Sequence, residues 1–488
     1  MLSFNYESVD VAFQLLCKIL FGRPVGSMKG FEPYLKEAML PYMIVKSSVS
    51  GKDVYLSNHM YPKGALFVAP DEVGKLRSSP IGINDIKDID SLFRAASENM
   101  VYCGNKVFGK NMNVELVDNA LNCIDVYFSH NVRNVKRGAF LSYVRESEYV
   151  FGIPAFPKIN YSMRCHEGIN VNRMFETFYT THSSDMYYSF NCTNCTEVIF
   201  GFNLRGKRHV IGNLELQPEK YAELKKKLTG EIASMLEKGK RAPSISDIAS
   251  LGAKKQLDEG EAVFIPTLPA PAGVEKAFSE TMKIVLGGEH REISDYVPWL
   301  QERALPVKKV KGRFGTRTFK PGMPLVKGIP DSSLCTFQEA IVENQPIVSE
   351  ADLVLSFSEI ARKVAPKAAF TMDFVDGACS DYVEVSQVID STDVYSSWDA
   401  TSSKHSGCST GIIQSQYIFG GYFRFLDSEF CINCYDVVEA KRCLEVDGSS
   451  RSVSCYFCHN IEGCVECIFW AFLSCFSDRK CFAFSHLN

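Results

Sequence analysis

The sequence lacks the marks of common enzymes, of exported proteins and of membrane spans. Ser50-Gly51-Lys52 lacks the preceding glycine of a P-loop, and neither an HExxH nor a GxSxG motif occurs. Glu7 and Asp10 stand where an export signal needs positive charge. The longest apolar run, Cys464 to Phe476, is interrupted by Glu466 and is too short to cross a bilayer. We therefore expect a non-enzymatic protein of the cytoplasm, or of a particle assembled there, without a membrane.

Tryptophan is scarce, and charge of one sign is not in excess. The 488 residues include 3 Trp beside 34 Phe and 21 Tyr, and the net charge is -4. Such a charge gives no general attraction to nucleic acid or anionic lipid. The aromatic content of 12% favours strands over a helical bundle.

One aromatic-rich segment recurs along the chain. Asp125 to Arg145 aligns without gaps on Asp185 to Arg205, with identical Asp, Tyr, Ser, two Asn, Phe and Arg. Ser454 to Leu473 is a third, weaker copy, in which Tyr456 falls on Tyr127. In a second register, Asp125 and Ser147 each begin a similar run of residues, 22 positions apart. The chain is therefore built, at least in part, from repeats.

The spacing of the repeats predicts the fold class. Cys431, Cys443, Cys455 and Cys467 are twelve residues apart, and Cys434 matches Cys458 at twenty-four. A unit of 22 to 24 residues, rich in Tyr, Phe, Val and Ile and broken by Asn, Ser and Gly, is typical of one coil of a parallel β-helix. We therefore predict a mainly β protein with helical insertions, in which stacked coils bury each other's inner faces.

Changes of composition divide the chain into four segments. Residues 1–100 form a mixed α/β cap, with helices over 9–21 and 32–40 and a strand over 53–56. Residues 101–216 form the first solenoid segment. Residues 217–371 form a helical and linker insertion that begins with a helix over 218–238. Residues 372–488 form a second, Cys-rich solenoid segment.

One stretch resembles a known group of proteins. Tyr187 to Leu228, with its SFNCTNC and FGFNLRGKRHVIGN segments and a following Pro-Glu-Lys-Tyr helix start, is similar to Cys-rich repeat proteins of candidate-phylum bacteria, archaea and their viruses. The similarity is close over about a tenth of the chain. It implies a β-solenoid and no particular activity, and the copy at 125–145 departs from it because Val132 and Val135 replace Cys192 and Cys195.

The 18 cysteines, ten of which fall between Cys408 and Cys481, allow three interpretations. Without an export signal, a disulfide framework is not expected. Pairs with the spacing of half a zinc site remain as metal candidates, with zinc as the one cofactor left open. The valines at two equivalent positions favour buried thiols over ligands, and a redox pair is the third interpretation. The candidate ligands are Cys431, Cys434, Cys455 and Cys458, and separately Cys192 and Cys195.

Other recurring polar residues have structural explanations. Asn131, Asn191 and Asn460 recur where a short amide could support a turn of left-handed φ, and His130 and His459 are expected at corners beside them. Recurring acids and arginines could also form the site of a carbohydrate-active β-helix enzyme, but their recurrence along the stack favours solvated turns. They are Asp125, Asp185, Asp393, Arg145 and Arg205.

One basic segment is a candidate for binding nucleic acid. Residues 308–320 hold six positive charges and no acid, with Phe314 and Phe319 interleaved, so cations could contact phosphates while rings stack on bases. The basic residues are Lys308, Lys309, Lys311, Arg313, Arg317 and Lys320.

Together these observations predict a structural subunit that self-associates into a larger assembly, such as a virus-like particle, a capsid-associated component or a filament. A solenoid exposes strand edges at its ends, and pairing with another chain would cover them. We expect a homo-oligomer, with other assembly subunits as further partners. A nucleic-acid-binding module and a carbohydrate-active enzyme are the alternatives.

Overall fold

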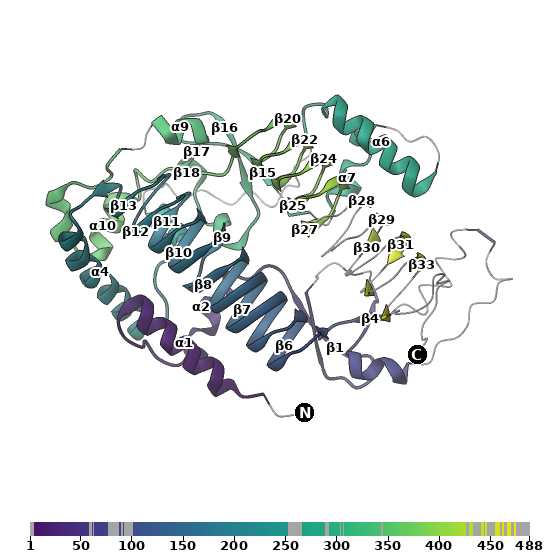
Figure 1. Ribbon diagram of the computed structural model, residues 1–488, viewed down its shortest axis with the longest axis horizontal. Helices are drawn as coiled ribbons and strands as arrows, with labels where there is room; N and C mark the ends of the chain where they lie inside the picture. Colours follow the sequence, from purple (N-terminus) through teal and green to yellow (C-terminus); the bar gives the residue numbers. More distant parts are fainter. Residues whose placement is uncertain are drawn as a thin grey trace. The chain divides into compact units, whose positions relative to one another are not determined.

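The structure, a computed structural model, is mainly β with helical parts (Figure 1). It describes residues 4–57, 61, 63–76, 87–88, 91, 101–251, 266–287, 292–302, 304–305, 307–342, 345–425, 429–432, 441–443, 445–446, 454–458, 461–462, 466–469 and 473–474. For Phe156 and most residues after 421, only the backbone is described. The chain divides into two compact units, Met1–Pro41 with Lys106–Gly260 and Lys309–Met372, and Tyr42–Asn105 with Glu261–Lys308 and Asp373–Asn488.

The first unit is built on one largely parallel sheet, whose strands lie side by side in Figure 1. Partners in its parallel pairs are mostly twelve residues apart, as in Met112↔Ile124, Val171↔Ile159 and Val198↔Val210. The last strand turns back in an antiparallel pair. The strands are β5 (Val107–Phe108), β6 (Met112–Leu121), β7 (Ile124–Pro157), β8 (Ile159–Met163), β9 (His166–Ile169), β10 (Val171–Thr181), β11 (Ser184–Phe190), β12 (Thr196–Ile199), β13 (Arg208–Ile211) and β14 (Leu214–Glu215).

The pairing corrects the predicted length of the repeat. Residues 125–145 and 185–205 are offset by 60 positions, five times the twelve-residue register, so their alignment follows the pairing. The 22-residue register does not follow the pairing. The predicted repeat of 22 to 24 residues is therefore not the spacing at which the strands pair. The twelve-residue spacing of the cysteines carried the true period, since Cys431 pairs with Cys443 and Cys455 with Cys467.

A three-residue pattern lies inside the twelve-residue repeat. From Asn113 to Gly212 every third residue has positive φ, and the residue after it is usually buried. Asn131 and Asn191, predicted to support left-handed turns, hold φ of 52° and 51°. Asp125, Asp185 and Asp393 hold such bends too. His130, predicted at a corner, is instead a buried residue beside the bend, in contact with Ser142.

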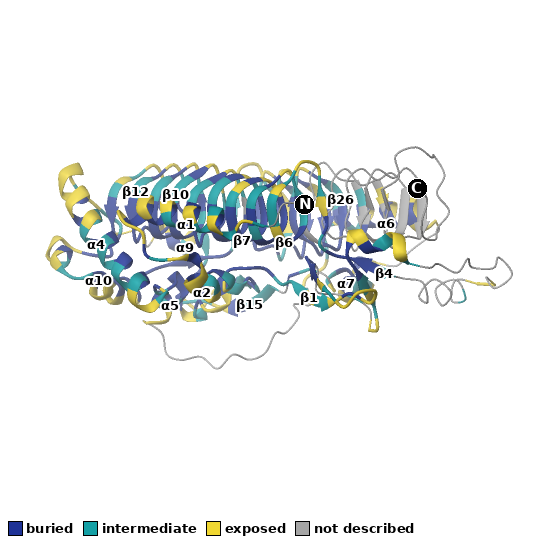
Figure 2. Cartoon of the chain, turned by 90° about the horizontal axis from the view of Figure 1, so that it is seen from below, coloured by how far each residue is buried: buried dark blue, intermediate teal, exposed yellow. Residues whose placement is uncertain are grey.

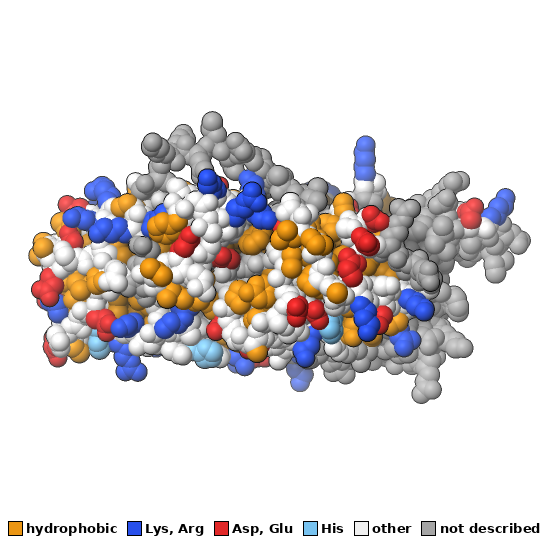
Figure 3. All heavy atoms as spheres, turned by 90° about the horizontal axis from the view of Figure 1, so that it is seen from above, with side chains coloured by type: hydrophobic (Ala, Val, Ile, Leu, Met, Phe, Trp, Pro, Cys, Tyr) orange, Lys and Arg blue, Asp and Glu red, His pale blue; other side chains and the backbone are white. Residues whose placement is uncertain are grey.

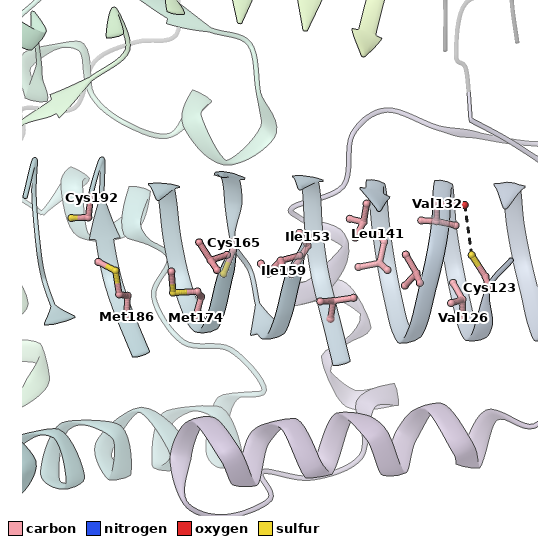
Figure 4. Close-up of a cluster of buried hydrophobic side chains, with 14 of the residues drawn as sticks. Cys123, Val126, Val132, Leu141, Ile153, Ile159, Cys165, Met174, Met186 and Cys192 are labelled. Atoms are coloured by element: carbon pink, nitrogen blue, oxygen red, sulfur yellow. Dashed lines mark hydrogen bonds between the residues drawn. The ribbon is translucent and has the colours of Figure 1, made fainter. Parts of the chain in front are cut away.

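The inward residues, each of which directly follows a residue with positive φ, form the core of the first unit. Figure 4 shows part of this core between the strands. Its members are Ala, Cys, Val, Leu, Ile and Met, without an aromatic residue. Four side chains from each twelve-residue unit point inward, and rings would not fit at that density. A glycine at one inward position leaves room for a large side chain at the next inward position. A Cβ on Gly201 would lie 3.0 Å from Leu204 Cδ1, and one on Gly138 would lie 2.9 Å from Leu141 Cδ1.

Helices cover one side of the first unit. In α1 (Tyr6–Phe21), Phe13 packs on Phe151 and Phe21 on Phe175, and Gly22 ends the helix with a φ of 82°. The predicted helices over 9–21 and 218–238 are thus confirmed, the latter as α4 (Pro218–Gly239). The remaining elements are α2 (Glu32–Lys36), α5 (Ile245–Ser250), β16 (Arg317–Pro321), α8 (Pro324–Lys327), β17 (Leu334–Cys335), α9 (Phe337–Val342), α10 (Phe357–Val364) and β18 (Phe370–Thr371).

The second unit contains the same twelve-residue register in two parallel sheets. Thr392 pairs with Lys404 in one sheet and Trp398 with Thr410 in the other. Helix α6 (Ala272–Leu286) packs on this part through Phe278 and Phe419. The strands of the two sheets are β19 (Phe374–Asp376), β20 (Ser380–Val383), β21 (Gln387–Ile389), β22 (Thr392–Tyr395), β23 (Trp398–Thr401), β24 (Lys404–Gly407), β25 (Thr410–Ile413), β26 (Gln416–Phe419), β27 (Tyr422–Phe425), β28 (Glu429–Ile432) and β29 (Lys441–Cys443).

Shorter elements complete the second unit. The predicted strand over 53–56 is confirmed as β2, which pairs antiparallel with β1. These elements are β1 (Met43–Lys46), β2 (Asp53–Leu56), β3 (Leu66–Val68), β4 (Val101–Cys103), α7 (Val297–Leu300), β30 (Glu445–Val446), β31 (Ser454–Cys458), β32 (Ile461–Glu462), β33 (Glu466–Phe469) and β34 (Leu473–Ser474). β15 (Val307–Lys311), most of which belongs to the first unit, forms a two-stranded sheet with β16 of that unit.

Candidate functional site

Cys192 and Cys195 lie in the buried core of the first unit, between β11 and β12. Both side chains are fully buried, and they occupy inward positions three residues apart. Val132 and Val135 occupy the equivalent positions five repeats earlier and belong to the same buried cluster. The two thiols therefore stand where the fold also accepts plain hydrophobic side chains.

Each thiol is held by backbone groups. Cys192 Sγ donates to Phe190 O at 3.5 Å, and Cys195 Sγ donates to Thr193 O at 3.3 Å. The Lys207 N–H donates to Cys195 Sγ at 3.5 Å. The two bonds from the thiols reach the carbonyl two residues earlier, as the bonds of inward serines do elsewhere in the unit, and Cys192 Sγ also contacts Gly201 O at 3.6 Å.

The two thiols have different acidities. A hydrogen bond with Cys192, together with the Lys207 N–H and the charge of Arg205, lowers the pKa of Cys195 to about 7. Burial and the neighbouring Cys195 raise the pKa of Cys192 above its ordinary value. The pair can therefore share a proton, but both sulfur atoms are shielded from solvent, so the arrangement offers a substrate no route to them.

The pair supplies only two of the four ligands of a structural zinc site. Across the residues that the structure describes, no group of three or more His, Cys, Asp or Glu side chains could hold a metal ion. The predicted site at Cys431, Cys434, Cys455 and Cys458 cannot be compared, because Cys434 and the side chains of the other three lie outside the described residues. Zinc at those positions stays a prediction.

The inward serines were missed as a set by the sequence analysis. Ser189 Oγ donates to Tyr187 O at 3.0 Å and accepts from the Gly201 N–H at 3.1 Å, twelve residues later. Ser403 in the second unit makes the same pair of bonds, to Thr401 O and from the Ser415 N–H. The signal that could have revealed them is a six-residue spacing of Ser391, Ser397, Ser403, Ser409 and Ser415.

A buried ion pair, also missed, fastens two helices to the sheet of the first unit. The Glu176 carboxylate accepts from Arg164 Nε, from Tyr34 Oη at 3.0 Å and from the Ile245 N–H at 3.1 Å. Burial alone would lower the pKa of Arg164, but Glu176 outweighs it and raises that pKa. Burial raises the pKa of Glu176, and its three donors offset part of the rise. The pair joins α2, α5 and the sheet, which is a structural role.

The basic segment 308–320 forms β15, a tight turn and β16, and several of its cations are engaged. Arg313 donates to Pro366 O and Ala368 O, just beyond the end of α10, at 2.8 and 3.0 Å. Lys320 donates to Ile329 O. Lys309 lies over the Phe319 ring. Phe314 at the turn is 48% exposed. Nucleic-acid binding by this segment stays a prediction.

The recurring acids and arginines lie on bends or beside them and pair locally. Asp185 accepts from Arg173 and Lys225, and Asp393 contacts His405 at 2.9 Å. Arg205 donates to Asn191 O at 2.7 Å. On the face of the molecule in Figure 3, Lys and Arg are interspersed with Asp and Glu among the residues described.

No protein-family model, no curated protein and no solved structure matches the chain. The resemblance of residues 187–228 to Cys-rich repeat proteins therefore stays a prediction. Among the described helices, none is long and apolar enough to cross a membrane.

Proposed function

We propose that the protein is a β-solenoid structural subunit that self-associates into a larger assembly, such as a particle or a filament. In this proposal the two stacks of parallel strands are solenoid segments with twelve residues in each coil. The constant register from Met112 to Ile211 supports it, as do the bends at every third residue. Four bends in each coil would return the chain to the same column.

The bonding of the interior supports a structural role. Each group of three residues consists of an outward residue, a bend residue with positive φ and an inward residue, and the N–H of each is used in a fixed way. The outward Thr196 N–H donates to Lys207 O, and the N–H of the bend residue Phe200 donates to Tyr187 O, both at 3.0 Å. The N–H of an inward residue can then bond the Ser or Cys one coil earlier, as Gly201 does with Ser189. Buried backbone donors need such partners. The inward polar side chains thus hold coils together.

Self-association is supported by one observation on the surface, an apolar stripe on the outer side of α1. Val11, Leu15 and Ile19 are 49%, 45% and 45% exposed, although the opposite side of the helix is buried. They follow one another at four-residue spacing, so they form one ridge. Single exposed apolar residues are ordinary, but a contiguous group of them marks a contact surface. Much of the other exposed surface of the helices, coloured yellow in Figure 2, is polar.

Sedimentation velocity over a range of protein concentrations tests this proposal. We expect the weight-average mass to rise well above the 54.6 kDa of one chain as concentration increases. A single species at the mass of one chain throughout the range would refute self-association. Zinc determination on the same sample would separately test the predicted cysteine site.

A further inference from the structure

The outer ridge of α1 has a self-complementary order of residues. At four-residue spacing it reads Glu7, Val11, Leu15 and Ile19. Arg23, the next residue at that spacing, follows Gly22, whose left-handed φ of 82° ends the helix. Reversed about Leu15, the order places Glu7 opposite Arg23 and Val11 opposite Ile19. Leu15 then faces itself. Apolar residues meet in either sense, but acid meets base only in the antiparallel one.

We propose that two copies of the chain dock through this ridge, antiparallel and related by a twofold axis at Leu15. The inference rests on the proposed self-association and names its first contact. A twofold contact uses the same patch on both copies, so a ridge that complements its own reverse is what such a contact requires.

The charges at the two ends of the ridge support the antiparallel sense. Glu7 lies in the first turn of α1 and is exposed, and the Arg23 side chain is 44% exposed while it contacts Glu237 at 2.7 Å. A parallel arrangement would place Glu7 beside Glu7 and would align the two helix dipoles, which repel in that orientation. The antiparallel arrangement relieves both.

The size of the surface sets the expected strength. A 16-residue helix is about 24 Å long, and a contact of that length is smaller than most stable interfaces, which bury roughly 1,200–2,000 Å². We therefore expect the pair to dissociate on dilution, and further contacts to be needed for a larger assembly.

Cysteine cross-linking tests the pairing directly. Leu15→Cys, treated with diamide, is expected to form a covalent dimer on a non-reducing gel, since this residue would lie on the axis. Val11→Cys and Ile19→Cys should each cross-link poorly alone and well when mixed. The unsubstituted protein under the same oxidant is the control for the native thiols. Cross-linking of Val11→Cys alone as strongly as the mixture would indicate a parallel pair and overturn the proposal.

Charge substitution separates this inference from the proposed function. Leu15→Glu should abolish the concentration-dependent rise in mass, and Ile284→Glu, on an equally exposed residue of α6 (44%), should leave it intact. Assembly of Leu15→Glu like the parent would overturn docking through α1 while self-association stands. A parent protein that is a monomer throughout would overturn both. A stripe that binds lipid vesicles instead of a second copy would overturn docking through α1.

Discussion

At the scale of single residues, the interior is governed by size at every third position. Gly201 lies between Val198 and Leu204, and a Cβ there would be 2.3 Å from Val198 Cγ1. A glycine beside a larger residue keeps the side-chain volume of each twelve-residue repeat within the narrow space available. The fold therefore depends on pairs of neighbouring inward residues, and not on any one of them.

Gly201→Ala should lower the free energy of unfolding by roughly 1–3 kcal/mol, because the added methyl overlaps Val198 in a packed interior. Urea denaturation measures the change. The matched control is Gly230→Ala in α4, where an added Cβ meets nothing within 4 Å. That change should raise stability by up to about 1 kcal/mol, the gain in helix propensity. Equal effects at the two glycines would contradict this account of the core.

His166 is a second residue with a measurable signature. Its ring is fully buried, stacks on Phe178 at 5.3 Å, and has no hydrogen-bond partner at either nitrogen in the described structure. Burial lowers the pKa of His166 to about 3. An unfolded histidine titrates near 6.5, so its contribution to stability is complete above that pH and is lost progressively as the pH falls toward 3.

His166→Phe should remove this loss, because Phe has no proton to bind and continues the stack of Phe178 and Phe190. Between pH 8 and pH 5 the free energy of unfolding of the parent protein should fall by about 2 kcal/mol more than that of the variant. Denaturation curves at the two pH values measure the difference. A parent protein and variant with the same pH dependence would show that His166 does not titrate in this way.

At the scale of elements, the buried ion pair links α2 and α5 to the sheet of the first unit. Glu176→Ala should lower the free energy of unfolding by about 3–5 kcal/mol, because Arg164 would stay buried after losing its buried counter-charge and would keep the partly exposed Glu37. Replacing both residues, as Glu176→Leu with Arg164→Met, should cost much less. Thermal denaturation followed by circular dichroism measures both.

The control for the ion pair is Glu223→Ala, which removes the exposed partner of Lys220 on α4 and should have no measurable effect. If the double substitution were as damaging as Glu176→Ala alone, packing and not the uncompensated charge would explain the loss.

The elements differ in how far the sequence predicts them. Helices α1 and α4 follow from apolar periodicity and from Gly22 and Pro218 at their ends. The mainly β character follows from composition. The three-residue pattern was missed because its bends are held by residues such as Phe140, Tyr143 and Arg137, for which positive φ is uncommon. Neighbouring repeats impose those bends, so the local sequence gives little sign of them.

The candidate site could be predicted only in part. That Cys192 and Cys195 share the environment of Val132 and Val135 was visible in the alignment. The Glu176 contacts were not, because Tyr34 and Ile245 are 142 and 69 residues away from it in the chain. Contacts over such separations are set by how helices lie on the sheet, which periodicity does not reveal.

At the scale of the whole molecule, a stack of twelve-residue repeats should tolerate the removal of one complete repeat without disturbance of the later repeats. Deleting residues 119–130 joins Asp118 to Asn131, which takes the bend of Asn119, and every later residue keeps its bend or inward position. Deleting residues 119–129 instead moves Val132 out of its inward position and shifts the register by one. A repeat of 22 residues would be broken by either deletion.

The thermal unfolding of these two deletion variants tests the twelve-residue repeat most directly. We predict that the twelve-residue deletion keeps cooperative unfolding and the circular dichroism of the parent, with a modest fall in Tm. The eleven-residue deletion should unfold at a far lower temperature or fail to fold. Equal losses, or a better-folded eleven-residue deletion, would contradict the twelve-residue repeat on which the proposed solenoid rests.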